Sequence, residues 1–283
     1  MNTPKPQLNA TDHDRGSTGM TYVYPVVSRR ARGISIGINL NPNNACNWRC
    51  VYCQVPGLTR GAAPEIDLTK LERELRQMLN DVLNGSFMRE RVPEEGRRLK
   101  DIAFSGNGEP TSSPEFAQAI TIAERVMRDF DLAGEIPLRL ITNGSLVEKP
   151  GVLDAIAHLG KCNGEVWFKV DAATQEGIAR INDVRLNPQG MLERLRLCAQ
   201  QCPPWVQTCI FALDGEPPPE HEIEAYLALL RQAADAIAGV HLYGLARPSM
   251  QPEASRLSRL TEAWMESLAD RIRQLGLPVN VSP

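Results

Sequence analysis

The chain has 283 residues, with 31 Lys and Arg against 34 Asp and Glu, so its net charge is −3 when the four His are neutral. An apolar content of 42% and a charged content of 23% exclude a wholly disordered or collagen-like chain, and the length allows one large α/β domain or two small ones. The mild acidity argues against a general polyanion binder. Seven cysteines form an odd set, and three of them crowd into one short segment.

The N-terminal segment, residues 1–20, is polar and lacks the features of a secretory signal or a transit peptide. We expect a flexible tail there, followed by one core domain over residues 21–283. No apolar run reaches the roughly 18 residues of a membrane span, so we expect no membrane partner. The expected compartment is the reducing cytosol, where clustered thiols hold metal more often than they form disulfides.

From Gly33 onward, short β-branched runs alternate with segments of helical period. The predicted strands are Gly33–Asn41, Leu99–Ser105, Leu138–Thr142, Glu165–Val170, Val206–Leu213 and Val240–Leu245. The predicted helices are Leu68–Leu83, Pro114–Phe130, Gly151–Leu159, Pro188–Gln201, Pro219–Ala238 and Ser255–Leu275. Asp67, Ser113 and Asn187 stand where helix caps are expected.

Successive βα units without a tandem antiparallel run predict an α/β fold with a parallel sheet and right-handed crossovers. Periodicity alone leaves two architectures open, a doubly wound open sheet and a partial (β/α)6 barrel. In both, the functional groups should gather in the loops after the carboxyl ends of the strands.

The loop after the first predicted strand carries Cys46, Cys50 and Cys53 in the spacing C-x3-C-x2-C. Three thiolates on one loop can bind a soft metal centre, and on a [4Fe–4S] cluster they leave one iron open for chemistry. The alternatives are weaker. A structural zinc site lacks a nearby fourth ligand, a disulfide leaves an odd thiol, and three buried thiols suit an Asn-rich loop poorly.

This spacing, with the aromatic Tyr52 just before the last cysteine, resembles the signature of the radical S-adenosylmethionine (SAM) superfamily. The resemblance covers about Gly33 to Val281, because the strand ends carry the further motifs in order. It implies a partial (β/α)6 barrel and a [4Fe–4S] cluster held by Cys46, Cys50 and Cys53. SAM would bind the open iron, with Tyr52 near its adenine.

Two further strand ends carry the resemblance. The second strand ends in a motif with Gly106, Gly108 and Glu109, where glycine permits close backbone approach to a ligand and a carboxylate suits an ammonium group. The resemblance implies that this motif holds the SAM amino group, although alone it could be an ordinary turn. The third strand ends in Thr142 and Asn143, which the resemblance places beside SAM; the alternative is a strand-end turn.

The fourth predicted strand puts Lys169 and Asp171 on one face by alternation. The resemblance implies contact with the SAM carboxylate or ribose, and the alternative is a mutual ion pair near the barrel mouth. After the sixth strand, Tyr243 and Arg247 resemble the adenine-facing end of the barrel, with Arg247 directed at SAM or substrate. We assign no catalytic residue.

Four cysteines remain outside the triplet: Cys162, Cys198, Cys202 and Cys209. We favour buried thiols over an auxiliary cluster for them, and a reactive Cys209 is a further option. The basic run Arg29–Arg32 fits a solvated, structural role better than contact with a phosphate backbone. Three histidines lack metal-ligand spacing and receive no role: His158, His221 and His241.

The resemblance implies that an external reductant, a flavodoxin or a ferredoxin, drives SAM cleavage and that a 5′-deoxyadenosyl radical abstracts hydrogen from a substrate. The motif around Glu109 looks closest to the Fe–S oxidoreductases related to wyosine tRNA-modifying enzymes. Because the chain is mildly acidic and lacks a second cysteine set upstream, we favour a small molecule or peptide over tRNA. A non-enzymatic Fe–S carrier or metal-binding module is the remaining alternative.

Overall fold

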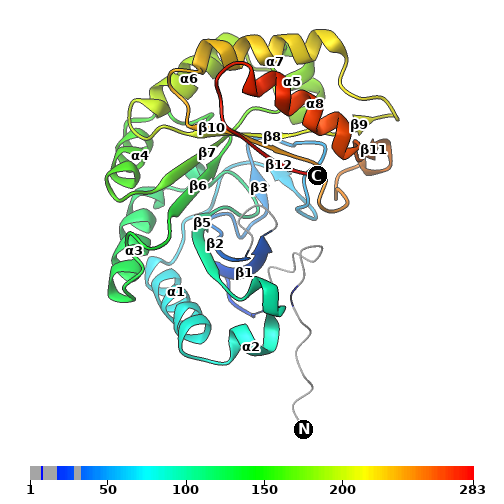
Figure 1. Ribbon diagram of the computed structural model, residues 1–283. Helices are drawn as coiled ribbons and strands as arrows, with labels where there is room; N and C mark the ends of the chain where they lie inside the picture. Colours follow the sequence, from blue (N-terminus) through cyan, green and yellow to red (C-terminus); the bar gives the residue numbers. More distant parts are fainter. Residues whose placement is uncertain (1–7, 9–17, 29–32) are drawn as a thin grey trace.

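The central element of the molecule is an eight-stranded sheet that curls into an open arc, with the helices on its outer side (Figure 1). The computed structural model describes residue 8, residues 18–28 and residues 33–283. In spatial order the strands are β1 (Val23–Ser28), β2 (Gly33–Ile38), β5 (Leu99–Phe104), β6 (Leu138–Thr142), β7 (Glu165–Lys169), β8 (Trp205–Cys209), β10 (Gly239–Tyr243) and β12 (Val279–Ser282). All neighbours are parallel except β1 and β2.

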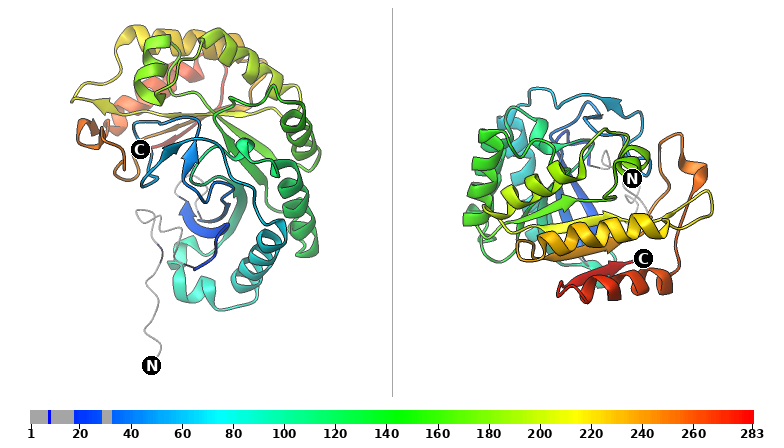
Figure 2. Two further views of the ribbon diagram at one scale, coloured as in Figure 1. Left: turned by 180° about the vertical axis from the view of Figure 1, so that it is seen from behind. Right: turned by 90° about the horizontal axis from the view of Figure 1, so that it is seen from above.

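The helices cover the convex side of this sheet in every view (Figure 2). They are α1 (Leu68–Leu83), α2 (Phe87–Arg91), α3 (Phe116–Asp129), α4 (Pro150–Lys161), α5 (Gln175–Asn182), α6 (Pro188–Ala199), α7 (Glu220–Ala233) and α8 (Glu262–Arg273). Two small sheets lie in the loops, β3 (Ala45–Cys46) with β4 (Thr59–Arg60) and β9 (Ala212–Leu213) with β11 (Leu257–Ser258). The outer strands of the arc do not pair with one another, so the predicted partial barrel is confirmed.

Alternation along the strands separates the apolar core from the interior of the arc. In β2, Ile34, Ile36 and Ile38 are fully buried in the core, whereas Ser35 and Gly37 line a cavity on the concave side. The same period places polar side chains of the other strands in that cavity. The sequence pattern therefore builds both the core and the walls of a site.

The edges of the sheet differ from the prediction. The antiparallel strand β1 was not expected, because its Pro25 reads against a strand; an edge strand tolerates proline since one side needs no ladder hydrogen bonds. The four-residue β12 adds a parallel strand at the other edge. The fifth predicted strand divides, since β8 ends at Cys209 and β9 pairs with β11 instead.

The predicted helices are present; α1 has the predicted bounds, and the ends of the others are shifted. Asp67 caps α1 by accepting from the Lys70 N–H, and Asn187 caps α6 by accepting from Gln189. The last helix, α8, begins at Glu262 rather than Ser255, because a 3-10 turn and β11 occupy the segment before it. The helices α2 and α5 were not predicted.

Parts of the N-terminal predictions lie outside the described residues. The basic run Arg29–Arg32 belongs there, as does most of the tail predicted for residues 1–20. Leu8 is described; it is buried, and its N–H donates to the carbonyl oxygen of Arg91. The domain boundary at residue 21 stays a prediction. Within the described part of the chain, no helix combines the length and apolar character that a membrane crossing requires.

Candidate active site

The cysteine triplet lies on the loop that follows β2, at the carboxyl ends of the strands, and all three thiols line the cavity inside the arc. The loop turns sharply at Asn44, whose φ of 54° is a left-handed conformation that asparagine adopts more readily than most residues. A second tight turn follows, in which the Cys53 N–H donates to the Cys50 carbonyl oxygen at 2.9 Å. These two turns direct the three thiols of the loop into the cavity inside the arc.

The end of α5 holds this loop in place. The Val51 N–H donates to the carbonyl oxygen of Ile181 at 2.9 Å, and Asn182 Nδ2 donates to Cys50 Sγ at 3.2 Å. On the outer side, the Arg49 guanidinium makes two hydrogen bonds of 2.9 Å to Glu253. The loop is therefore anchored by segments far away in the sequence.

The donor set fits a cluster better than a single metal ion. At Zn–S distances near 2.3 Å, tetrahedral zinc ligands lie about 3.8 Å apart. Such a zinc site needs four ligands, whereas the loop supplies three thiols, all of which line one cavity. A [4Fe–4S] cluster binds each thiolate on a different iron, and three thiolates leave its fourth iron open.

Burial controls the protonation of these thiols. It raises the pKa of Cys46 and of Cys50 to about 12 each, so both groups are neutral thiols at pH 7 without a metal. Metal binding would replace these protons. The N–H of Trp48, at 3.4 Å from Cys46 Sγ, and Asn182 at Cys50 are donors that stabilise sulfur as a thiolate.

Glu109 is a buried carboxylate, 2% exposed, that lines the same cavity. Its oxygens accept hydrogen bonds from Thr142 Oγ1 at 2.6 Å and from the Asn143 N–H at 2.7 Å, and from the Thr111 hydroxyl at 2.6 Å. Burial raises the pKa of Glu109 above its ordinary value, while these hydrogen bonds oppose the rise. The carboxylate is thus fixed in orientation before any ligand arrives.

Glycine is required at two positions before Glu109 for a reason other than the expected close approach of a ligand. A Cβ on Gly106 would lie 2.4 Å from Asn39 Oδ1, and one on Gly108 would lie 2.0 Å from the Ala45 carbonyl oxygen. Both positions therefore need glycine so that the loop after β5 can pack directly against the cysteine loop. The space left by the missing side chains is therefore filled by the cysteine loop and not by a ligand.

Asp171 differs from the other predicted site residues because it does not line this cavity. Its carboxylate accepts from the Tyr52 hydroxyl at 2.5 Å, from Asn182 Nδ2 at 2.8 Å and from the Cys209 N–H at 2.9 Å. It faces a second cavity between α5 and α7. Asp171 therefore supports the wall of the site from behind.

Lys169 stands in the wall that Asp171 supports. Its Nζ lies 2.9 Å from the Tyr243 hydroxyl and 3.5 Å from Asp171 Oδ1, so the alternative of a mutual ion pair is realised. Burial alone would lower the pKa of Lys169, but the Asp171 carboxylate raises it above the ordinary value overall. The ammonium group also lies 5.0 Å from the ring centre of Tyr52.

The cavity brings together every predicted site residue except Asp171. Arg247 completes its rim and donates to Gln54 Oε1 at 3.3 Å. The predicted residues that line the cavity are Cys46, Cys50, Tyr52, Cys53, Gly106, Gly108, Glu109, Thr142, Asn143, Lys169, Tyr243 and Arg247.

Comparison with known proteins decides the family. Residues 40–230 match the family model of the radical SAM superfamily. The chain belongs to this superfamily. Enzymes of this superfamily use a [4Fe–4S] cluster and SAM, and membership favours an enzyme over a non-enzymatic electron carrier. The proposed kinship with wyosine-related enzymes stays a prediction.

Two curated relatives match part of this radical SAM chain. UPF0026 protein MJ1312 of Methanocaldococcus jannaschii is 31% identical over 164 residues, which cover 58% of this chain and 44% of the relative. GTPase Obg of Brachyspira hyodysenteriae is 27% identical over 125 residues, covering 44% of this chain and 16% of that protein. The chain thus spans less than half the length of each.

Solved structures support the fold. A radical SAM methyltransferase from Sphaerobacter thermophilus superposes with a TM-score of 0.57 at 15% identity, covering 88% of this chain and 66% of that one. At this identity the likeness concerns the fold alone.

Further polar side chains of the strands line the cavity, and these residues, called the floor below, were not predicted from the sequence. Arg139 is bonded there to Asp101 and, at 2.7 Å, to Glu165, while Gln207 from β8 is 1% exposed. The Nε2 of Gln207 has no hydrogen-bond partner among the described residues. Polar residues at alternate positions of apolar strands, such as Arg139 between two leucines, were the available signal.

The remaining cysteines divide into two groups. Cys198, Cys202 and Cys209 are buried, in agreement with the favoured expectation of buried thiols. Cys209 also lines the cavity that contains the triplet, and a reactive role for it stays a prediction. Cys162 is only half-buried, and its Sγ lies 3.7 Å from His158 Nε2. All four are free of disulfide bonds.

Proposed function

We propose that Cys46, Cys50 and Cys53 hold the [4Fe–4S] cluster, and that this enzyme cleaves SAM reductively and abstracts a hydrogen atom from a substrate inside the barrel. When bound, the cluster and SAM supply the 5′-deoxyadenosyl radical that performs the abstraction. One observation carries the proposal: a single cavity joins the triplet, the fixed carboxylate of Glu109 and a buried polar floor.

The residues of the chain provide the binding groups for SAM in this proposal. Glu109 offers its carboxylate to the amino group, and its hydrogen bonds to Thr142 and Asn143 remove the cost of orienting it. Lys169 brings a positive charge to the wall for the carboxylate or ribose of SAM. Asp171 acts indirectly, because it positions Tyr52 and Lys169.

The floor of the cavity points to a polar substrate. A buried amide donor without a partner costs free energy, on the order of 1–3 kcal/mol, unless a ligand supplies an acceptor. Gln207 is such a donor, whereas Arg139, which lines the same cavity, is hydrogen-bonded to Asp101. We therefore propose a small molecule or a peptide segment with a carbonyl or hydroxyl acceptor, which can enter the interior of the arc. A flavodoxin or ferredoxin is the proposed electron donor.

The decisive experiment is anaerobic reconstitution with iron and sulfide, followed by dithionite and SAM. We expect a [4Fe–4S] signal in electron paramagnetic resonance that changes on addition of SAM, and formation of 5′-deoxyadenosine. Cys50→Ala is the control. The absence of both the SAM-responsive signal and 5′-deoxyadenosine from wild-type protein would refute the proposal.

The substrate part is tested separately with Gln207→Leu. Gln207 pairs with Lys169 across β7 and β8 but is none of the groups proposed to bind SAM, so substrate-free SAM cleavage should stay within about twofold of wild type. Small-molecule and peptide fractions of a cell extract are then screened for stimulation of 5′-deoxyadenosine formation, which the variant should lose. Stimulation by bulk tRNA, with salt-sensitive binding, would favour the tRNA alternative instead.

A further inference from the structure

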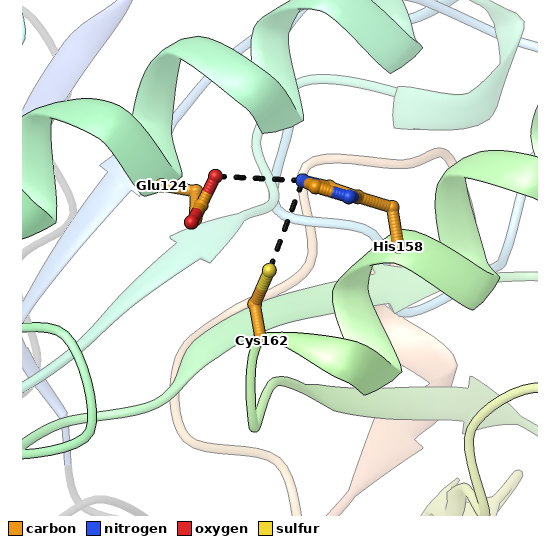
Figure 3. A group of neighbouring side chains, drawn as sticks. All are labelled: Glu124, His158 and Cys162. Atoms are coloured by element: carbon orange, nitrogen blue, oxygen red, sulfur yellow. Dashed lines mark hydrogen bonds and ion pairs between the residues drawn. The ribbon is translucent and has the colours of Figure 1, made fainter.

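A second group of metal-ligating side chains lies on the outer side of the barrel, between α3 and α4 (Figure 3). Glu124 projects from α3, while His158 and Cys162 come from the end of α4. His158 Nε2 lies 3.5 Å from Glu124 Oε2 and 3.7 Å from Cys162 Sγ, and all three ligand atoms are within 4.8 Å of one another. This group is separated from the cavity, which lies on the concave side of the sheet.

Local structure explains how the three residues meet. His158 and Cys162 are four residues apart, so the last turn of α4 places both side chains on one face. Adjacent packing of α3 and α4 brings Glu124 against that face. All three residues are half-buried, which limits the motion of their side chains and still leaves one side open to solvent.

The distances match those around a zinc ion. With Zn–N near 2.0–2.1 Å and Zn–S near 2.3 Å, tetrahedral geometry places a nitrogen about 3.6 Å from a sulfur ligand and about 3.3 Å from an oxygen ligand. The corresponding separations here are 3.7 Å and 3.5 Å. A thiolate, an imidazole and a carboxylate are also the ligand types that zinc prefers.

The arrangement does not fit a catalytic Cys–His–Glu relay. In a relay, the thiol and the carboxylate contact opposite nitrogens of the imidazole ring. Here both contact the same atom, Nε2 of His158, so the three ligand atoms form a triangle (Figure 3). Because all three atoms lie within 4.8 Å of one another, they are close enough to bind one cation together.

The other oxygen of Glu124 strengthens this interpretation. Oε1 accepts a hydrogen bond from the Arg128 guanidinium, one helical turn further along α3. The carboxylate is therefore held with Oε2 directed at His158. Ligating carboxylates are commonly oriented by such outer hydrogen bonds.

We propose that Glu124, His158 and Cys162 bind one zinc ion, with water at the fourth position on the solvent side, and that the ion joins α3 to α4. Binding displaces the thiol proton of Cys162 to solvent and involves no redox change. The site is independent of the iron–sulfur cluster, because none of its ligands lines the cavity that contains the triplet.

The test uses anaerobically prepared, cluster-loaded protein, equilibrated with zinc chloride, desalted and assayed for zinc and iron per chain. We expect one zinc in addition to four irons in wild type. Cys162→Ser and His158→Ala should bind zinc at least about tenfold more weakly, with iron unchanged. His221→Ala is the matched control, because it removes an exposed histidine beside a carboxylate, Glu222, and should keep the zinc.

Zinc-edge X-ray absorption locates the ion. The expected spectrum has one sulfur near 2.3 Å and nitrogen or oxygen ligands near 2.0–2.1 Å. Zinc should also raise the unfolding temperature of wild type and not that of Cys162→Ser. Three sulfur ligands, full zinc content in Cys162→Ser, or wild-type protein that retains no zinc would each overturn the proposal.

Discussion

The molecule has two sites built with cysteine, and the chain assembles them in different ways. In the triplet, all three thiols belong to one loop between β2 and α1, and distant segments such as Asn182 and Glu253 hold that loop. In the outer group, His158 and Cys162 share a helical turn and Glu124 comes from another helix. Spacing in the sequence therefore reveals the first site, whereas only the packing of α3 on α4 reveals the second.

The largest expected difference between the two sites is the effect of removing one thiol. Cys50→Ala should lose the intact [4Fe–4S] signal and lower SAM cleavage by more than about a thousandfold, because a cluster ligand cannot be replaced by a methyl group. Cys162→Ala should keep both the signal and the activity within about twofold. Iron content, electron paramagnetic resonance and 5′-deoxyadenosine formation measure these outcomes. Equal losses in the two variants would contradict the separation of the sites.

The fold was predictable because its signals are local. Each of the six predicted strands alternates or runs apolar over its own length, and helix caps such as Asp67 bond only to neighbouring residues. The edge strand β1 was not predicted, because Pro25 interrupts its run of Val and Tyr, and only the pairing with β2 shows that the segment is a strand. Tertiary pairing likewise set the end of the fifth strand, whose last two residues join β11.

The site was predictable to the extent that motifs mark the strand ends. The orientation of the Asp171 side chain was not predictable. Alternation placed it on the same face as Lys169, whereas three donors from other segments hold its carboxylate outside the cavity. Gln207 and the outer group were missed for a related reason. Their meaning depends on what lies opposite them in space, and a single sequence does not contain that information.

The next largest effect concerns the charge of Glu109. Glu109→Gln should weaken SAM binding by about ten- to hundredfold, the range for a charge-assisted hydrogen bond of about 1.5–3 kcal/mol. Thr142→Val is the matched control, because it removes one hydrogen bond of Glu109 and keeps the charge. This variant should lose about tenfold or less in its affinity for SAM. Calorimetric titration of SAM into cluster-loaded protein measures both, and equal affinities in Glu109→Gln and wild type would remove Glu109 from the SAM site.

A smaller effect is expected from the hydrogen bond between Asn182 Nδ2 and Cys50 Sγ. A donor to a ligating sulfur stabilises the negative charge that reduction adds, so Asn182→Ala should lower the reduction potential of the cluster. We expect a decrease of about 60 mV, which is tenfold in the equilibrium constant of a one-electron couple. A redox titration followed by electron paramagnetic resonance measures it. His158→Ala, in the outer group, should leave the potential unchanged, and an equal shift in both variants would argue against a specific effect at Cys50.

The smallest effect concerns the outer anchor of the cysteine loop. Arg49 bonds Glu253 and Asp183, and these hydrogen bonds lower the pKa of both carboxyls below their ordinary values. A carboxyl with a lowered pKa stabilises the fold above its unfolded pKa and loses this contribution as the pH falls through its folded pKa. The stabilisation should therefore be complete at neutral pH and fade below about pH 4.

Arg49→Met keeps the aliphatic stem and removes both pairs. Because the Asp183 side chain is 44% exposed and solvent screens the charges, we expect a loss of only about 1 kcal/mol at pH 7, or roughly 2 °C in Tm. Asp183 also keeps its ion pair with Arg60 at 2.9 Å, which limits the loss further. Thermal unfolding of cluster-free protein between pH 7 and pH 3 should show the two Tm curves converging in acid. A constant difference in Tm across this pH range would mean that Arg49 stabilises the loop by packing rather than by charge. In either case, Arg49→Met should leave the zinc content of the outer group unchanged.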